Sequence, residues 1–79
     1  MLKFKLLLPD YTLFEGDVLS VTARGELGQF EVLKNHAPFM TSIHSGDVTV
    51  RKEDGEKVIF KVNGGFFYIE NNQAVLLGS

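Results

Sequence analysis

The stretch "DVTVRKEDGEKVIFKV", residues 47–62, decides the fold class. Apolar and polar residues alternate on both sides of Asp54-Gly55, and a period of two is typical of a half-buried β-strand. The dipeptide Asp-Gly favours a type I′ turn, in which both central residues have positive φ. The stretch therefore predicts a β-hairpin that pairs a strand around 47–53 with a strand around 56–62.

The same alternation recurs along most of the chain. The apolar residues expected to share one face in each segment are Phe4, Leu6 and Leu8; Leu19, Val21 and Ala23; Val48 and Val50; and Val58, Phe60 and Val62. Asn71-Asn72 is expected to join strands at 66–70 and 73–77 by a turn of the same kind. The longest glycine-free stretch, 29–45, contains Pro38 and leaves no place for a long helix. Many short strands at this spacing predict an all-β sandwich or barrel.

Length and composition limit what such a chain can do. The 79 residues predict one domain, 1–79, with a small core and little room for a deep catalytic cavity. Eight basic residues against ten acidic ones argue against a general nucleic-acid binder. No signal peptide is recognisable, and no apolar run approaches the roughly 20 residues that span a bilayer. We expect a soluble, cytoplasmic chain.

No constellation of catalytic or metal-binding residues is present in the sequence. The absence of cysteine excludes disulfides, thiol nucleophiles and zinc–thiolate sites. His36 and His44 are the only histidines, too few for a three-histidine zinc site, and no helical spacing supports a site of two histidines and a carboxylate. No serine lies in a G-x-S-x-G elbow and no glycines form a phosphate-binding motif. We therefore predict no catalytic residue, no metal ligand and no cofactor.

The segment "FFYIE" at 66–70 allows two interpretations. Phe67 and Ile69 suit the core, so Phe66 and Tyr68 should face the other side of the strand. These two rings could cover the outer edge of a small domain. They could instead form an exposed patch that docks a partner, because large apolar patches on small soluble domains often mark interfaces.

The segment "GQFEVLKNHAPF" at 28–39 raises a second choice, because a histidine stands just before Ala37-Pro38. The histidine could be a chemical group at the tip of a loop, or part of a structural turn. Pro38 restricts Ala37 to an extended backbone, and an imidazole at His36 can bridge backbone groups across the turn. With metal, nucleophile and phosphate chemistry unsupported, a mainly structural role is favoured, with partner contact as the alternative.

Three segments together closely resemble one family. "GQFEVLKNHAPFMTSIHSGDV" at 28–48, "LLPDYTLFEGDVLSV" at 7–21 and "VNGGFFYIENNQAVLL" at 62–77 resemble, in the right order, the epsilon subunit of bacterial rotary ATP synthases, called delta in mitochondria. The resemblance implies a flattened, ten-stranded β-sandwich. Most members continue into a C-terminal hairpin of two helices. This chain stops at Ser79, where the sandwich would end, so the resemblance implies the sandwich alone and leaves inhibition or ATP binding by such helices in doubt.

The resemblance also implies a function. The family subunit is not catalytic; it sits at the foot of the central rotor stalk, binds the gamma subunit, rests on the ring of c subunits, and helps couple ion-driven ring rotation to ATP synthesis. Its place would be the cytoplasmic face of the bacterial inner membrane, reached only through the complex. The competing interpretation is a free-standing β-sandwich adaptor that binds a peptide or another domain.

Site residues follow from an ungapped match counted back from His36. In the family, one loop contacts the ring, and this match places it at Gly28, Gln29, Phe30, Glu31 and Val32, with Gln29 and Glu31 at the loop tip. Many family members have "GELG" directly before this region. Here "GELG" occurs at 25–28, outside the ungapped match, so we interpret it as partly coincidental. The positions expected to contact gamma are Asp10, Tyr11, His36, Pro38, Phe39, Met40 and Thr41, with Phe66 and Tyr68 as weaker candidates.

Overall fold

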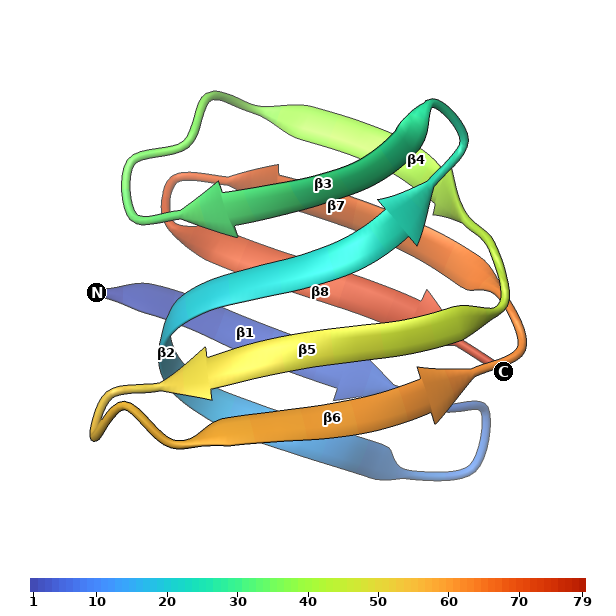
Figure 1. Cartoon of the computed structure of the whole chain (residues 1–79), viewed down its shortest axis with the longest axis horizontal. Helices are drawn as coiled ribbons and strands as arrows, with labels where there is room; N and C mark the ends of the chain where they lie inside the picture. The colour runs from blue at the N-terminus through green and yellow to red at the C-terminus, as the bar shows by residue number, and fades with distance from the viewer.

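The computed structural model describes residues 1–79 and consists of β-strands joined by short connections (Figure 1). In chain order the strands are β1 (Leu2–Leu7), β2 (Thr12–Gly25), β3 (Gly28–Leu33), β4 (Phe39–Ile43), β5 (Gly46–Lys52), β6 (Lys57–Val62), β7 (Gly65–Glu70) and β8 (Gln73–Gly78). The all-β prediction is confirmed. The strands number eight instead of ten, because β2 runs unbroken for 14 residues and takes part in both layers. No helix of the chain could cross a membrane.

The strands form a two-layered sandwich that shares β2. Residues 20–25 of β2 pair with β3, and residues 18–22 pair with β5, which pairs in turn with β6. These four segments make the front layer in Figure 1. Residues 12–18 of β2 pair with β1, which continues through β8 and β7 to β4 and makes the rear layer. All pairs are antiparallel except β1 with β8, the first and last strands of the chain.

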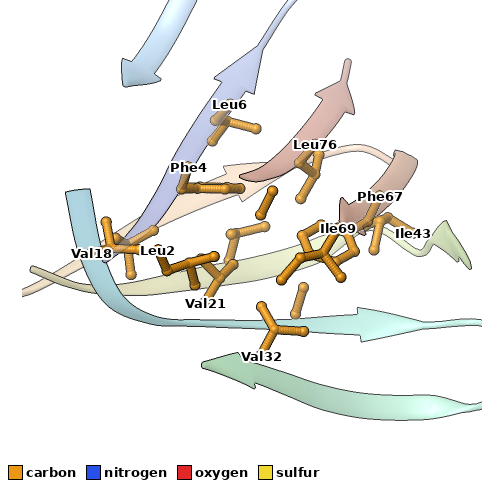
Figure 2. Close-up of a cluster of buried hydrophobic side chains, with 14 of the residues drawn as sticks. Leu2, Phe4, Leu6, Val18, Val21, Val32, Ile43, Phe67, Ile69 and Leu76 are labelled. Atoms are coloured by element: carbon orange, nitrogen blue, oxygen red, sulfur yellow. The ribbon is translucent and has the colours of Figure 1, made fainter. Parts of the chain in front are cut away.

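The core lies between the two layers, as the alternation predicts. Side chains from every strand point into this space (Figure 2). The buried apolar residues are Leu2, Phe4, Leu6, Val18, Val21, Ala23, Val32, Ile43, Val48, Val50, Val62, Phe67, Ile69, Ala74 and Leu76. Burial of apolar surface at about 25 cal/mol per Å² is the main favourable term for so small a domain. Leu8, expected on the core face, lies just beyond the end of β1 and is only half-buried.

One expected core residue, Leu19, is exposed. The register between β2 and β5 shifts between Val18 and Ser20, which inserts one extra residue into β2. Such a β-bulge re-aims the side chains around it. Val18 and Val21 therefore both face the core, while Leu19 turns to solvent. The prediction that Leu19, Val21 and Ala23 share one face was wrong for Leu19, for this reason.

The two predicted hairpins form, with different turns. Asn71 and Asn72 have φ of 51° and 60°, which confirms a two-residue type I′ connection between β7 and β8. At the β5–β6 hairpin only Gly55 has positive φ, 90°, and its N–H donates to the Lys52 carbonyl at 2.9 Å. The type I′ prediction for Asp54-Gly55 was wrong, because residues 53–56 separate the strands and a loop of this length favours a type I turn followed by a glycine.

Candidate interaction surfaces

The described chain brings no catalytic or metal-binding groups together. His36 lies between β3 and β4, and His44 lies between β4 and β5. No group of three or more His, Cys, Asp or Glu side chains converges anywhere in the structure.

The first surface is the tip of the β2–β3 hairpin, formed by Glu26 and Leu27 between the paired residues Gly25 and Gly28. Leu27 is 100% exposed and nothing packs against it. Gly28 takes φ of 120°, a backbone conformation that L side chains rarely adopt. The tip is braced from β4, because the Glu26 N–H donates to the Thr41 hydroxyl at 3.3 Å. It is a protruding loop with one apolar and one acidic side chain.

The predicted ring-contact segment, Gly28 to Val32, forms a strand instead of a loop. Gln29 and Glu31 lie along the outer face of β3, so their placement at the loop tip was wrong. Val32 is 0% exposed and belongs to the core, so its side chain is not free to touch a partner. The cross-strand pair of Gly25 with Gly28 decides the register, and it puts the turn inside "GELG". The ungapped match counted back from His36 therefore did not identify Glu26 and Leu27 as the tip of the loop.

An aromatic cluster holds the inner side of this region together. The rings of Phe30 and Phe39 lie 5.2 Å apart in an edge-to-face arrangement, and Phe30 lies 5.0 Å from Phe67. Such pairs contribute about 0.5–1.5 kcal/mol beyond area burial. Phe30 and Phe39 close the side of the sandwich between β3 and β4, which do not pair with each other. Both rings pack against the core and are half-buried, and the prediction that they contact partners stays a prediction.

Asn35 and Asn72 clamp the β3–β4 connection onto the β7–β8 turn. The Asn35 N–H donates to Asn72 Oδ1 at 2.5 Å, and Asn72 Nδ2 donates to Asn35 Oδ1 at 3.1 Å. Both residues have φ near 60°, which asparagine tolerates better than most residues. The Asn72 carbonyl also accepts the Lys3 N–H at 2.9 Å, which adds β1 to the node. We call this pair the asparagine clamp.

His36 has a more local role than predicted. Its Nδ1 lies 2.7 Å from the Ala37 carbonyl, a contact that requires the proton on Nδ1. Its ring meets Phe39 edge-on at 5.9 Å. The imidazole thus bonds the adjacent residue and does not bridge the turn. The prediction of a bridging histidine was wrong, because Asn35 and Asn72 supply that bridge from residues 37 positions apart.

The second surface covers the outer face of the rear layer. Met40 pairs with Tyr68, and Phe66 pairs with Leu77. All four side chains point away from the core and are exposed. Half-buried Leu7 and Val75 lie beside them on β1 and β8, because Leu7 pairs with Leu77 and Val75 with Tyr68. We call Met40, Phe66, Tyr68 and Leu77 the rear apolar patch. The sequence predicted three of its members, and the alternation of Leu77 with buried Leu76 could have added the fourth.

The remaining predicted gamma contacts do not form one surface. Pro38 is exposed and lines a hollow of about 350 Å³ beside Met40 and Tyr68, so it extends the rear apolar patch. Thr41 points toward the hairpin tip, where it accepts the Glu26 N–H. Asp10 and Tyr11 lie in the β1–β2 connection, which a hydrogen bond from the Leu8 N–H to the Tyr11 carbonyl closes.

Fold and surfaces together define a small β-sandwich domain with two exposed surfaces, the hairpin tip and the rear apolar patch. A more particular identification comes from comparison with known proteins. The family described as "ATP synthase, Delta/Epsilon chain, beta-sandwich domain" matches residues 1–78, and the chain belongs to this family. The epsilon chain of ATP synthase is a stalk subunit and is not itself catalytic.

Individual relatives agree with the family. The ATP synthase epsilon chain of Chlorobium limicola is 37% identical over 75 residues, a match that covers 95% of this chain and 85% of the relative. That of Caulobacter vibrioides is 48% identical over 65 residues, covering 82% and 74%. That of Dichelobacter nodosus is 36% identical over 69 residues, and the match covers 87% of this chain but 48% of the relative. The chain thus spans about half the length of some relatives and most of others.

Solved structures support the fold. A chain of the Euglena gracilis mitochondrial ATP synthase superimposes with a TM-score of 0.89 at 22% identity, covering 95% of this chain and 48% of that chain. A chain of the Tetrahymena thermophila mitochondrial ATP synthase, from a structure of its central stalk and c-ring, gives a TM-score of 0.82 at 14% identity, covering 96% and 61%. At these identities the likeness shows the fold alone.

Proposed function

We propose that the chain is a non-catalytic subunit of the central stalk of an F-type ATP synthase. It binds the gamma subunit, rests on the c-ring, and helps couple ion-driven ring rotation to ATP synthesis. Membership of the epsilon family supports this role. The complex holds the subunit at the cytoplasmic face of the bacterial inner membrane. A rotor component needs rigidity and contact area, and no activated group.

The rear apolar patch carries the proposal of gamma binding. It gathers two aromatic rings, a methionine and a leucine on one sheet face, and aromatic residues and methionine are enriched at the centres of protein interfaces. A stable interface buries at least roughly 1,000 Å² in total, which such a sheet face and its rim can supply. Pro38 and Glu70 border the patch beside Met40 and Tyr68 and form part of that rim.

The hairpin tip supports the proposal of ring contact. Glu26 and Leu27 protrude, and Gln29 stands next to them on the outer face of β3. Glu31 lies farther along the same face and is a weaker contact candidate. Gly28 permits the turn, while Phe30 and Val32 anchor it to the core. The ring would therefore meet a tip held by the β2–β3 pairing and by the hydrogen bond from the Glu26 N–H to Thr41.

Gamma binding is tested by co-expression with gamma and gel filtration. Tyr68→Lys places a charge in the centre of the rear apolar patch and should abolish the stoichiometric complex. Ile59→Lys is the matched control, because Ile59 is a 58% exposed apolar residue on the front layer. If both variants keep the complex, the patch is not the gamma surface. If the unaltered chain forms no complex at all, the rotor function is wrong and the free-standing adaptor replaces it.

Ring contact is tested with a single cysteine, since the chain has none of its own. Leu27→Cys, labelled with a photoactivatable thiol reagent in the assembled complex, should cross-link to a c subunit. Asp54→Cys, in the exposed turn between β5 and β6, provides the control. Cross-links from Asp54→Cys alone would mean that the opposite end of the sandwich faces the ring.

A further inference from the structure

A groove of about 510 Å³ opens at the end of the sandwich where the N-terminus and the ends of β3 and β5 meet. Met1, Leu19 and Leu33 are its exposed apolar walls. Its volume lies within the roughly 300–1,000 Å³ typical of binding pockets. The groove is lined by the start of β1 together with residues of β2, β3 and β5, and it shares no residue with the rear apolar patch.

The β-bulge in β2 creates this groove. Without the extra residue, the alternation would turn Leu19 toward the core. With it, Leu19 stands in solvent beside Leu33 of the neighbouring strand, and Ser20 lies beneath Leu33 as its cross-strand partner. Bulges that re-aim a side chain are over-represented at functional sites. Exposing a leucine at this irregular point of β2 suits a site that receives an apolar group.

The rim of the groove is basic and leads onto a basic sheet face. Arg51 and Lys34 line the groove, and Lys57 pairs with Arg51 on the outer face of β5 and β6. Arg24 stands farther along the face on β2. None of these four cations takes part in a salt bridge, since the three in the chain use other basic residues. Lys61 on this face is paired with Asp47.

Among the residues that line the groove, the basic side chains outnumber the acidic one, although Glu53 and Asp54 lie nearby in the β5–β6 turn. Glu31 is the one acidic residue of the groove rim, and it makes no salt bridge. The protein as a whole carries a net charge of −2. An unpaired basic surface on an acidic protein attracts carboxylate-rich partners and repels basic ones.

We propose that the front layer docks an acidic segment of another protein. An apolar side chain of that segment sits in the groove against Leu19 and Leu33, and its carboxylates face Arg51 and Lys34. A buried apolar anchor with a charged rim is the usual anatomy of such a contact. A bilayer is flat and cannot enter the groove. No aromatic side chain lies on the outer face of this layer for nucleobases to stack on.

The test uses a fluorescent, end-capped peptide of sequence EDELLFDEE with the whole chain, followed by fluorescence anisotropy. Leu33→Gln should weaken binding about tenfold, because it removes an apolar wall of the anchor site. Leu77→Gln is the matched control on the rear layer, since the two leucines are 51% and 46% exposed. Arg51→Gln should weaken binding about threefold at low salt and less at about 0.5 M salt, where the charges are screened. Circular dichroism confirms that each variant is folded.

Three further ligands make the proposal refutable. EDEAAADEE, which keeps the charges and lacks the anchor, and KKKLLFKKK, which reverses them, should both bind at least about tenfold more weakly. Vesicles containing anionic phosphatidylglycerol should not bind. Equal binding of the alanine peptide, equal loss in Leu77→Gln, binding to vesicles alone, or no binding of EDELLFDEE would each overturn the proposal. Tyr68→Lys should leave peptide binding unchanged, so failure here is distinguishable from failure of gamma binding.

Discussion

The asparagine clamp should contribute measurably to stability although it lies at the surface. Two hydrogen bonds join Asn35 to Asn72, and a typical bond contributes about 0.5–1.5 kcal/mol. One of the two bonds comes from the Asn35 backbone N–H, so only the bond from Asn72 Nδ2 to Asn35 Oδ1 joins the two side chains. Because Asn35 is exposed, the lower part of that range applies, and we expect a coupling of about 0.5–1 kcal/mol between the two side chains. The clamp is the only side-chain link between the β3–β4 connection and the β7–β8 turn.

Glycine is the right replacement for measuring this coupling. Both asparagines adopt a left-handed backbone that glycine accepts without strain, whereas alanine would add a cost of about 1–2 kcal/mol. Asn35→Gly, Asn72→Gly and the double variant form a cycle in which the unfolded-state cost of each glycine cancels. Asn71→Gly is the matched control, because Asn71 has φ of 51° in the same turn and makes no side-chain hydrogen bond.

Urea unfolding at neutral pH measures the effect. For a domain of this size the slope is about 1 kcal/mol per M, so Asn72→Gly should lower the midpoint by about 1–2 M more than Asn71→Gly does. The double variant should be more stable than the sum of the two single losses predicts, because Asn72→Gly already removes both hydrogen bonds, including the one that Asn35→Gly removes. A coupling below about 0.3 kcal/mol, or equal losses in Asn71→Gly and Asn72→Gly, would refute the argument.

Four other substitutions test the packing. Gly65→Ala should abolish cooperative thermal unfolding, because a Cβ there would overlap the Leu77 carbonyl oxygen, whereas Gly28→Ala, with open space around it, should leave a folded protein. Phe67→Ala should cost about 3–5 kcal/mol in urea unfolding, since this ring is fully buried, and a loss below about 1 kcal/mol would contradict its place in the core. Leu19→Ala should change stability by less than about 0.5 kcal/mol, and a loss of 2 kcal/mol or more would show that Leu19 is a core residue after all.

Sequence periodicity predicts this fold well wherever a strand buries one face only. In β7 the buried Phe67 and Ile69 and the exposed Phe66 and Tyr68 follow the alternation directly. The prediction fails at Leu19 because a bulge changes the phase of the pattern, and Ser20 gives no apolar signal of the change. Local sequence thus predicts which positions of a regular strand are buried. It does not predict the bulge in β2, which depends on how β2 pairs with β5.

The interaction surfaces are harder to predict than the core. The hairpin tip depends on which residues pair across β2 and β3, and that register puts the turn at Glu26 and Leu27. The asparagine clamp joins residues 37 positions apart, a contact that no local pattern reports. Within the rear apolar patch, Met40 becomes the neighbour of Tyr68 only because β4 pairs with β7. Each of these features arises from tertiary pairing, which single-sequence patterns do not contain.

The parallel pairing of β1 with β8 has a mechanical consequence. The two strands lie side by side, while the chain ends project from opposite ends of the sandwich (Figure 1). A force that pulls the termini apart therefore loads all the β1–β8 hydrogen bonds at once, in shear, instead of opening them one after another. Held by its ends in an optical trap, the domain should resist extension until this pair slips, and should then unfold in a single step.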